Sequence, residues 1–191
     1  DGVHDGGQHG IGTHLARPFA AIALPAIATQ MAAPFGNYLL TSVFAGFGDA
    51  AVAGWAVINR LTVVAYGGLF SLAWAIGGIF GQNFGAGLYP RLLQTYRDAL
   101  IFCVGYALVT WGLLVLATPA IARGFGLDGE AAAVLRAFTH VGAGAFVFAG
   151  LLFVSNAAFN ALGRPTRASV LNWFKEGVFL LPAALWLSGP F

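Results

Sequence analysis

Residues 61–90 read LTVVAYGGLFSLAWAIGGIFGQNFGAGLYP and contain no charged side chain. A helix needs about 20 apolar residues to cross the hydrocarbon core of a bilayer, so this run is long enough to span a membrane. A fifth, shorter apolar segment follows Glu176, and three other long charge-free runs occupy 18–48, 99–122 and 137–163. The sequence therefore predicts an all-α, polytopic membrane protein with five transmembrane helices.

The composition agrees with a membrane protein and excludes several other classes. Hydrophobic residues make up 59% of the 191 residues and charged residues only 8%, against about 25% charged residues in soluble domains. The net charge is +2 without a basic cluster, so no nucleic-acid partner is expected. The single Cys103 provides neither a disulfide nor a metal-ligand spacing. His4, His9 and His14 recur without an acidic or Cys partner, which favours a solvated linker over a metal site.

The charged and helix-breaking residues divide the chain into a linker and a transmembrane part. Residues 1–16 are predicted to be a flexible Gly/His-rich linker, and residues 17–191 a transmembrane unit. Pro90 suits the first turn of a helix, Asp128 suits a helix N-cap, and Gly163 suits a helix stop. The five helices are predicted at about 17–47, 51–83, 90–124, 129–162 and 167–188.

Arginines in the short loops predict the orientation. One side of the membrane carries five of them, Arg17, Arg91, Arg97, Arg164 and Arg167, and the other side carries Arg123 and Arg136. Because positive charge accumulates on the cytoplasmic side, the N-terminal end is expected in the cytoplasm. The protein is then a multi-pass protein of the cell membrane, inner or plasma.

The glycines of the second apolar run, GGIFGQNFGAGLYPR at 77–91, could indicate a phosphate loop or a packing surface. No strand precedes them and the Lys and Ser/Thr of a Walker motif are absent, so phosphate binding is excluded. Ala73, Gly77, Gly81 and Gly85 recur every four residues and share one helix face. This spacing predicts close packing between membrane helices.

Polar side chains inside the predicted spans are the candidates for a substrate pathway. Gln30, Pro34, Asn37 and Thr41 follow one helical face of the first span. Pro34 removes one backbone hydrogen bond and permits a bend that could serve gating. The alternative for the polar residues is hydrogen bonding between helices, worth about 0.6 kcal/mol per contact. The face is interpreted as lining a pathway.

Two further spans add candidates of the same kind. Asn156 and Asn160 lie four residues apart on the fourth span, beside Phe153 and Phe159. Amides with aromatic neighbours suit large, flat organic cations, although 17 Phe in the chain make such neighbours common. Tyr66 on the second span is a further pathway candidate, and the alternative is ordinary aromatic packing.

Several motifs together carry a resemblance to a known family. In chain order they are PAIATQMAAPFGN (25–37), FGDAAVAGWAVINR (47–60), GQNFGAG (81–87), FNALGRPTRA (159–168) and LLP (180–182). The order and spacing resemble the C-terminal half of a multidrug and toxic compound extrusion (MATE) transporter. The resemblance implies twelve helices in two six-helix lobes around a cavity that opens alternately to each side. The chain would supply helices seven to eleven, and its partners would be the N-terminal lobe and the last helix.

The resemblance also implies a function. The implied protein is a secondary active antiporter that exports drugs or toxic organic cations. It would have no cofactor and no enzymatic activity. One branch of the family binds its coupling cation through carboxylates on helices seven and ten, and the matching spans contain no Asp or Glu. The expected coupling ion is therefore H+, with Na+ as the less favoured alternative and the coupling residue outside this sequence.

Three other functions remain as alternatives. A lipid-linked saccharide flippase of the same superfamily ranks below the drug exporter. Such a protein would need cationic side chains for the diphosphate, and the spans hold few of them. A non-transporting membrane scaffold is a further possibility. An intramembrane enzyme is disfavoured because no convergent nucleophile, base or metal-ligand motif occurs.

Overall fold

The chain is all α-helical in the part that the structure describes, residues 8–175 and residue 177 of a computed structural model. Its elements, in chain order, are α1 (Gln8–Gly46), α2 (Asp49–Gly85), α3 (Tyr89–Gly124), α4 (Gly129–His140), the short 3-10 helix η1 (Gly142–Gly144), α5 (Ala145–Ala161) and α6 (Pro165–Phe174). Three segments, 49–85, 89–124 and 129–161, are long and apolar enough to cross a membrane. Five spans remain a prediction, because α1 is not among these three and most of the last predicted helix lies outside the described residues.

The first helix is longer than the sequence indicates. Helix α1 begins at Gln8, so residues 8–16 belong to it rather than to a linker; residues 1–7 lie outside the described residues. No proline or charged residue interrupts the segment between Gln8 and Ala16. Because adding a residue to an existing helix is much easier than nucleating a new one, the helix continues backwards from the apolar run.

Three of the turns between helices are built in the same way. The Leu88 N–H donates to the Asn83 carbonyl at 2.8 Å, the Leu127 N–H to the Ala122 carbonyl at 2.9 Å, and the Arg164 N–H to the Phe159 carbonyl at 2.8 Å. The glycines that precede these donors have positive φ values, +69° at Gly87, +63° at Gly126 and +69° at Gly163. This is the Schellman motif, which needs the left-handed conformation that glycine adopts without strain. The predicted stop at Gly163 is confirmed, and Pro90 lies in the first turn of α3 as predicted.

The fourth predicted helix, 129–162, is interrupted. Helix α4 ends at His140, and η1 separates it from α5. A Cβ on Gly142 would approach Phe138 Cδ2 to 2.8 Å, and a Cβ on Gly144 would approach the Trp111 ring to 3.2 Å. The two glycines therefore permit a tight change of direction that an apolar run alone does not reveal. Asp128 does precede α4, but its side chain makes no capping hydrogen bond.

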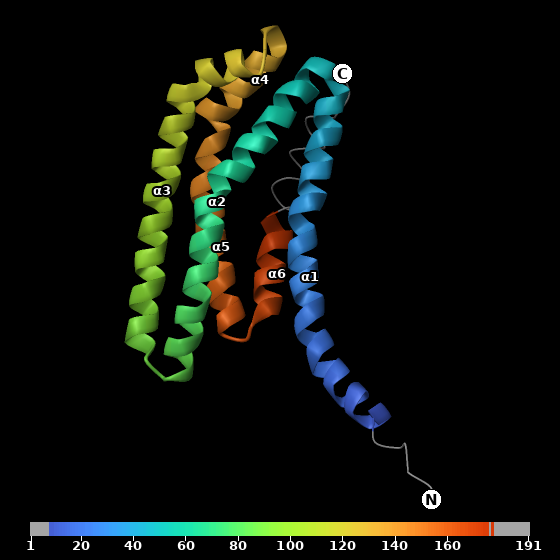
Figure 1. Cartoon of the computed structure of the whole chain (residues 1–191), viewed down its shortest axis with the longest axis vertical. Coiled ribbons are helices and arrows are strands. Elements are labelled where there is room, and N and C mark those ends of the chain that lie inside the picture. Colours follow the sequence, from blue (N-terminus) through green and yellow to red (C-terminus); the bar gives the residue numbers. More distant parts are fainter. Residues whose placement is uncertain (1–7, 176, 178–191) are drawn as a thin grey trace, which may run out of the picture.

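Three hydrophobic clusters hold α2, α3, α4 and α5 together along the length of the bundle. One joins α2 to α4 around Ile58 and Leu135, and another joins α2, α3 and α5 around Leu69, Phe80 and Val154. Between them is a smaller cluster of Ala65, Ala107, Ala143 and Phe146. Helix α2 changes direction along its length, so that its first half leans across toward α1 while its second half runs beside α3 and α5 (Figure 1).

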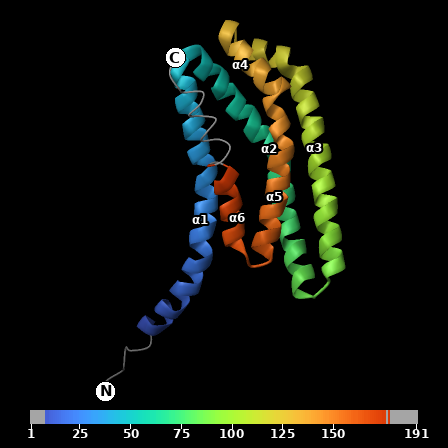
Figure 2. The same cartoon turned by 180° about the vertical axis from the view of Figure 1, so that it is seen from behind.

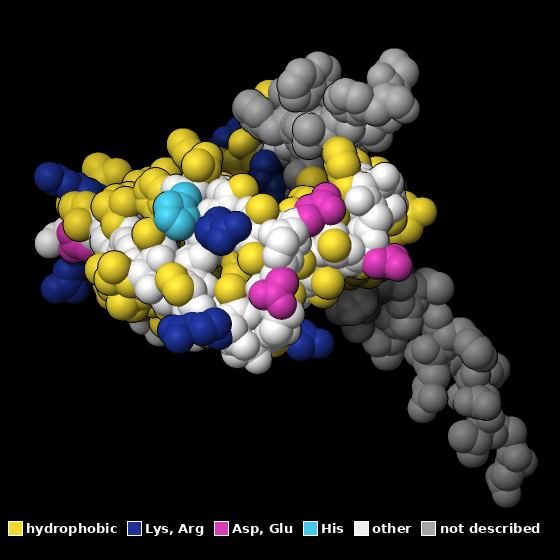
Figure 3. All heavy atoms as spheres, turned by 90° about the horizontal axis from the view of Figure 1, so that it is seen from above, with side chains coloured by type: hydrophobic (Ala, Val, Ile, Leu, Met, Phe, Trp, Pro, Cys, Tyr) yellow, Lys and Arg dark blue, Asp and Glu magenta, His cyan; other side chains and the backbone are white. Residues whose placement is uncertain are grey.

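Helix α1 lies on the opposite side of the molecule from α3, with α6 beside it (Figures 1 and 2). It packs mainly against α6 and less extensively against α2. The turn from α1 to α2 and the turn from α3 to α4 are at the same end, as the predicted alternation of loops requires. Viewed from that end, acidic and basic side chains are scattered among apolar ones (Figure 3).

Candidate transport pathway

The predicted polar face of α1 is exposed for most of its length. Gln30, Pro34 and Asn37 are all exposed in the part of the chain that the structure describes. Beside them on the helix, the large side chains Met31, Phe35 and Tyr38 are 55%, 41% and 69% exposed. The amide and aromatic groups of α1 are thus open to a ligand, to lipid or to a further part of the protein. Their role in transport stays a prediction.

Thr41, the fourth member of that face, is engaged differently. Its hydroxyl lies 2.8 Å from the Asn37 carbonyl and accepts a hydrogen bond of 3.0 Å from Trp55 Nε1 of α2. The Trp55 ring also stacks on Phe44 with 4.7 Å between the ring centroids. These contacts fix α1 against α2. The structure therefore favours the interhelical alternative for Thr41 over the lining of a pathway.

Helix α1 continues through Pro34 without a break. Pro34 has no N–H to donate to the Gln30 carbonyl one turn earlier, and both residues are exposed. Its role in gating or bending stays a prediction.

Asn156 carries the polar atom that is hardest to explain by packing. Its Oδ1 is buried and has no hydrogen-bond partner within the described residues. Buried amide oxygens are nearly always paired with protein or with ordered water, so this oxygen is able to accept a hydrogen bond from water, a ligand or another part of the protein. Asn160, one turn along α5, is exposed. Only the first of the two predicted amides is thus in an unusual environment.

Tyr66 belongs to a cluster of aromatic rings between α2 and α5. Its ring meets Phe146 and Phe153 edge-on, at centroid distances of 5.1 and 5.5 Å, and Phe70 at 6.1 Å. Edge-to-face pairs of this kind stabilise a packed core by about 0.5–1.5 kcal/mol each. These contacts favour the packing alternative for Tyr66.

The described structure does not bring the two sets of amides together. Helices α1 and α5 make no contact in the described part, and α6 contacts both of them. The hydroxyls of Thr29 and Ser169 lie 2.7 Å apart, and Trp173 Nε1 donates to the Ala28 carbonyl at 2.8 Å. The sequence did not predict this polar contact between α1 and α6. Small hydroxyl side chains in an apolar run were its only signal.

The glycine stripe does not pack as predicted within the described residues. A Cβ built on Gly77, Gly81 or Gly85 would have no atom within 4 Å, and Ala73 on the same face is partly buried. The close approaches occur at other glycines. A Cβ on Gly54 would lie 2.8 Å from the Ala131 carbonyl oxygen, and a Cβ on Gly150 would lie 3.2 Å from Cys103 Cβ. The reason is that α3 and α5 pack against the face of α2 that carries Leu69, Ile76 and Phe80, which is a different face from the stripe.

The described residues contain no group of three or more His, Cys, Asp or Glu side chains that could hold a metal ion. The acidic side chains that the structure describes, Asp49, Asp98, Asp128 and Glu130, are all exposed; Asp98 is the tenth residue of α3, and the other three lie at helix ends. The candidate pathway therefore consists of neutral amides and aromatic rings.

These features define a helical, multi-pass membrane protein with polar groups placed along apolar helices. A sequence model of the MatE family matches residues 25–185. The chain therefore belongs to the MatE family, the family of MATE-type transporters.

Two relatives are similar over shorter or more distant matches. An uncharacterized 21 kDa protein of Pseudomonas savastanoi is 35% identical over 126 residues, which is 66% of this chain and 42% of that protein. An FAD transporter of Shewanella oneidensis is 26% identical over 165 residues, which is 86% of this chain and 36% of that protein. The chain thus spans about two fifths of the length of these relatives. No solved structure matches it.

Proposed function

We propose that the chain forms part of a proton-coupled antiporter that exports planar organic cations, including drugs. It works with a second, N-terminal lobe and a last helix, in the cell membrane, with its own N-terminal end in the cytoplasm. The observation that carries the proposal is the family match over residues 25–185, combined with the exposed amide and aromatic face of α1.

The chemistry of that face supports an organic ligand. Gln30 and Asn37 offer hydrogen-bond donors and acceptors, while Phe35 and Tyr38 offer aromatic surface. A cation over an aromatic ring gains about 0.5–2 kcal/mol, more when water is excluded. No ionised side chain lies on α1 between Arg17 and Asp49, so binding depends on shape and ring contacts and tolerates many substrates.

The absence of acidic side chains from α1 and α5 supports a coupling site elsewhere. Coupled transport requires a titratable or cation-binding group that the two states expose differently. Among the described residues, Asp49, Asp128 and Glu130 lie at helix ends, and Asp98 is an exposed residue ten positions into α3. The proton-binding carboxylate is accordingly placed in the other lobe.

A flavin dinucleotide is the second candidate substrate, because one relative that matches 86% of the chain is an FAD transporter. Such a ligand has flat aromatic rings that suit the same face of α1. It also carries a negatively charged diphosphate, which that face does not neutralise. A lipid-linked saccharide flippase is third, because the described spans offer Arg60 of α2 as a cation for a diphosphate, and it is exposed.

The test is transport of a fluorescent cationic dye and of FAD by efflux-deficient cells that express the protein. Lower dye accumulation that disappears when the proton gradient is collapsed supports the proposal. Asn37→Ala should raise dye accumulation severalfold, whereas Ser42→Ala, an exposed α1 residue on another face whose hydroxyl bonds the Tyr38 carbonyl, should not. Dependence on sodium would contradict the proton coupling, and export of FAD without the dye would favour the second candidate.

A further inference from the structure

An apolar groove lies between α5 and α6, next to the turn that joins them. It has a volume of about 320 Å³ and is lined by Phe159 of α5 and by Thr166, Arg167, Val170 and Leu171 of α6. The atoms that form its surface are apolar, so the Thr166 hydroxyl and the Arg167 guanidinium lie beside the groove rather than in it. The aliphatic stem of an arginine commonly covers apolar surface in this way while its charge stays outside. The groove therefore combines an apolar wall with a cation at its edge.

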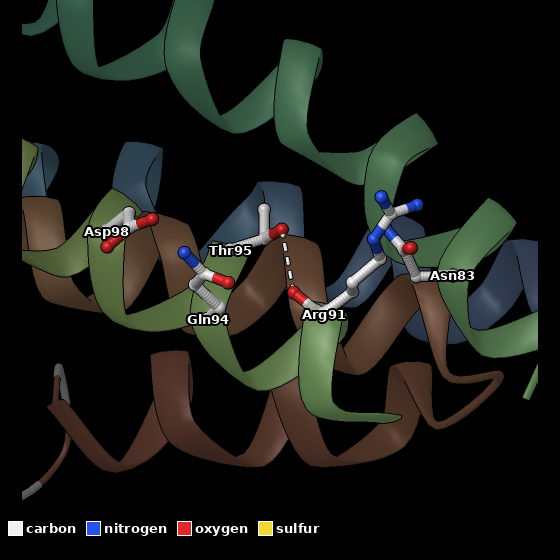
Figure 4. Close-up of a pocket in the computed structure, with 5 residues that line it drawn as sticks. All are labelled: Asn83, Arg91, Gln94, Thr95 and Asp98. Carbon is white, nitrogen blue, oxygen red and sulfur yellow. Dashed lines mark hydrogen bonds between the residues drawn. The ribbon is translucent and has the colours of Figure 1, made fainter. Parts of the chain in front are cut away.

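A polar cleft at the same end of the molecule offers a comparison. It has a volume of about 290 Å³ and is lined by Asn83 of α2 and by Arg91, Gln94, Thr95 and Asp98 of α3 (Figure 4). The turn from α2 to α3 and the turn from α5 to α6 are both at this end (Figure 1). The cleft contains a cation and an anion, Arg91 and Asp98, and every residue that lines it is polar. The two hollows thus suit ligands of different chemistry.

The groove lies where the membrane surface is expected. The segment 129–161 is apolar and long enough to cross a membrane, and Phe159 is close to the end of that segment. Helix α6 turns back beside α1 (Figures 1 and 2), so Val170 and Leu171 lie deeper than Arg167, by about 5–6 Å along the helix axis. From the membrane surface inward, the cation therefore comes first and the apolar wall of the groove second.

The positive charge beside the groove has no acidic neighbour on its own helix. Arg164, three residues before Arg167, is a second exposed arginine at the start of α6. The α6 sequence, PTRASVLNWF, contains no Asp or Glu. Asp98 belongs to α3, which makes no contact with α6 in the described part of the chain. A ligand that reaches both arginines is therefore favoured when its head is anionic.

We propose that this groove binds an anionic glycerophospholipid of the phosphatidylglycerol class. One acyl chain lies in the groove against Phe159, Val170 and Leu171. The lipid phosphate accepts hydrogen bonds from the Arg167 guanidinium, since arginine binds phosphate oxygens in pairs, and Arg164 adds a second attractive charge. The acyl chain, phosphate and outer headgroup then follow the same order as the apolar wall, the cation and the water. The site does not depend on the transported substrate or on the coupling ion.

The charges at the edge of the groove determine which lipid is preferred. Phosphatidylcholine can place its acyl chain in the same groove, but its quaternary ammonium lies beyond the phosphate, close to Arg164 and Arg167. The like charges repel each other and weaken the phosphate contact. Phosphatidylglycerol has a neutral glycerol in that position, so its negative charge is available to both arginines.

Native mass spectrometry of the purified protein with each of these two lipids tests the proposal. Arg167→Gln should lower the association constant of phosphatidylglycerol by about fivefold, the effect of one basic residue near an anionic lipid surface, and should reduce its preference over phosphatidylcholine. Val170→Trp fills the groove and should lower the association constants of both lipids. Val170 is 61% exposed, so the larger ring does not enter the core.

Arg91→Gln is the matched control. Arg91 is also an exposed arginine in the first turn of a helix at the same end of the molecule, but it lines the polar cleft and not the groove. Its replacement should leave the binding of both lipids unchanged. An equal loss in Arg91→Gln would mean that diffuse positive charge, not the groove, holds the lipid.

The remaining outcomes also overturn the proposal. Unchanged lipid binding in Val170→Trp would place the acyl chain elsewhere. Glycerol phosphate should not displace the lipid at matched concentration, because it has no acyl chain for the groove; equal displacement would indicate a site for a soluble phosphate. If the unaltered protein retains neither lipid and Val170→Trp lowers its unfolding temperature in detergent, another helix of the protein fills the groove.

Discussion

Replacement of Gly54 by alanine should destabilise the protein, although alanine is the better helix former. A Cβ at Gly54 would lie 2.8 Å from the Ala131 carbonyl oxygen and 3.2 Å from Val134 Cβ. The first contact is with the backbone of α4, so no side-chain rotation can relieve it, and α4 must move away from α2. Overpacking of this kind costs about 1–3 kcal/mol.

The helix propensity of alanine offsets part of that cost. Gly→Ala in a helix interior gains about 0.8–1.0 kcal/mol, so the expected net loss in the free energy of unfolding is about 0–2 kcal/mol, against a gain at an unhindered position. Gly77→Ala is the matched control on the same helix, because its Cβ would meet nothing within 4 Å. It should gain up to about 1 kcal/mol.

The assay is reversible unfolding in detergent micelles, followed by circular dichroism. Val134→Ala in the Gly54→Ala background should recover part of the loss, because it removes the Val134 Cγ1 atom that would lie 3.3 Å from the new Cβ, and the two sites are coupled. If Gly54→Ala stabilises the protein as much as Gly77→Ala does, α2 and α4 are not closely packed at this point and the reasoning is refuted.

Three further predictions follow from single contacts. Trp173→Phe removes the hydrogen bond to the Ala28 carbonyl and should lower the unfolding free energy by about 0.6 kcal/mol; an unchanged stability would mean that this bond does not hold α6 to α1. Thr139→Val removes the buried hydroxyl 2.8 Å from that of Thr118, and a double-mutant cycle with Thr118→Val should show coupling rather than additive losses. Asn156→Leu removes the unpaired Oδ1 and should raise stability by about 1 kcal/mol while lowering dye export; raised stability with unchanged export would exclude Asn156 from the pathway.

The sequence predicted the helices well where their ends have strong local signals. Pro90 marks the start of α3, and Gly163 ends α5, because each restricts or frees the backbone at one position. The interruption at Gly142–Gly144 was missed, since the surrounding residues are apolar and helix-forming on both sides. Its cause is tertiary, namely the rings of Trp111 and Phe138 that occupy the space beside the glycines.

The candidate site was predictable only as a set of polar positions. Spacing placed Asn37 and Thr41 on one face of α1, but it could not indicate that the Thr41 hydroxyl accepts a hydrogen bond from Trp55. Spacing also predicted packing at Gly77, whereas the close approach is at Gly54. In both cases the missing information is which helix lies against which face, and a single chain's periodicity does not contain it.

The pairing of α1 with α6 has a consequence for biosynthesis. The hydroxyls of Thr29 and Ser169 are separated by 140 residues in the chain, which a ribosome needs on the order of 10 s to synthesise at about 5–20 residues per second. Among the described residues, the other helix that α1 contacts is α2, through Trp55, and it is made at the start of that time. Helix α1 is thus fixed against α6 only late in the synthesis of this segment, and a chaperone or insertase that shields it would act in this interval.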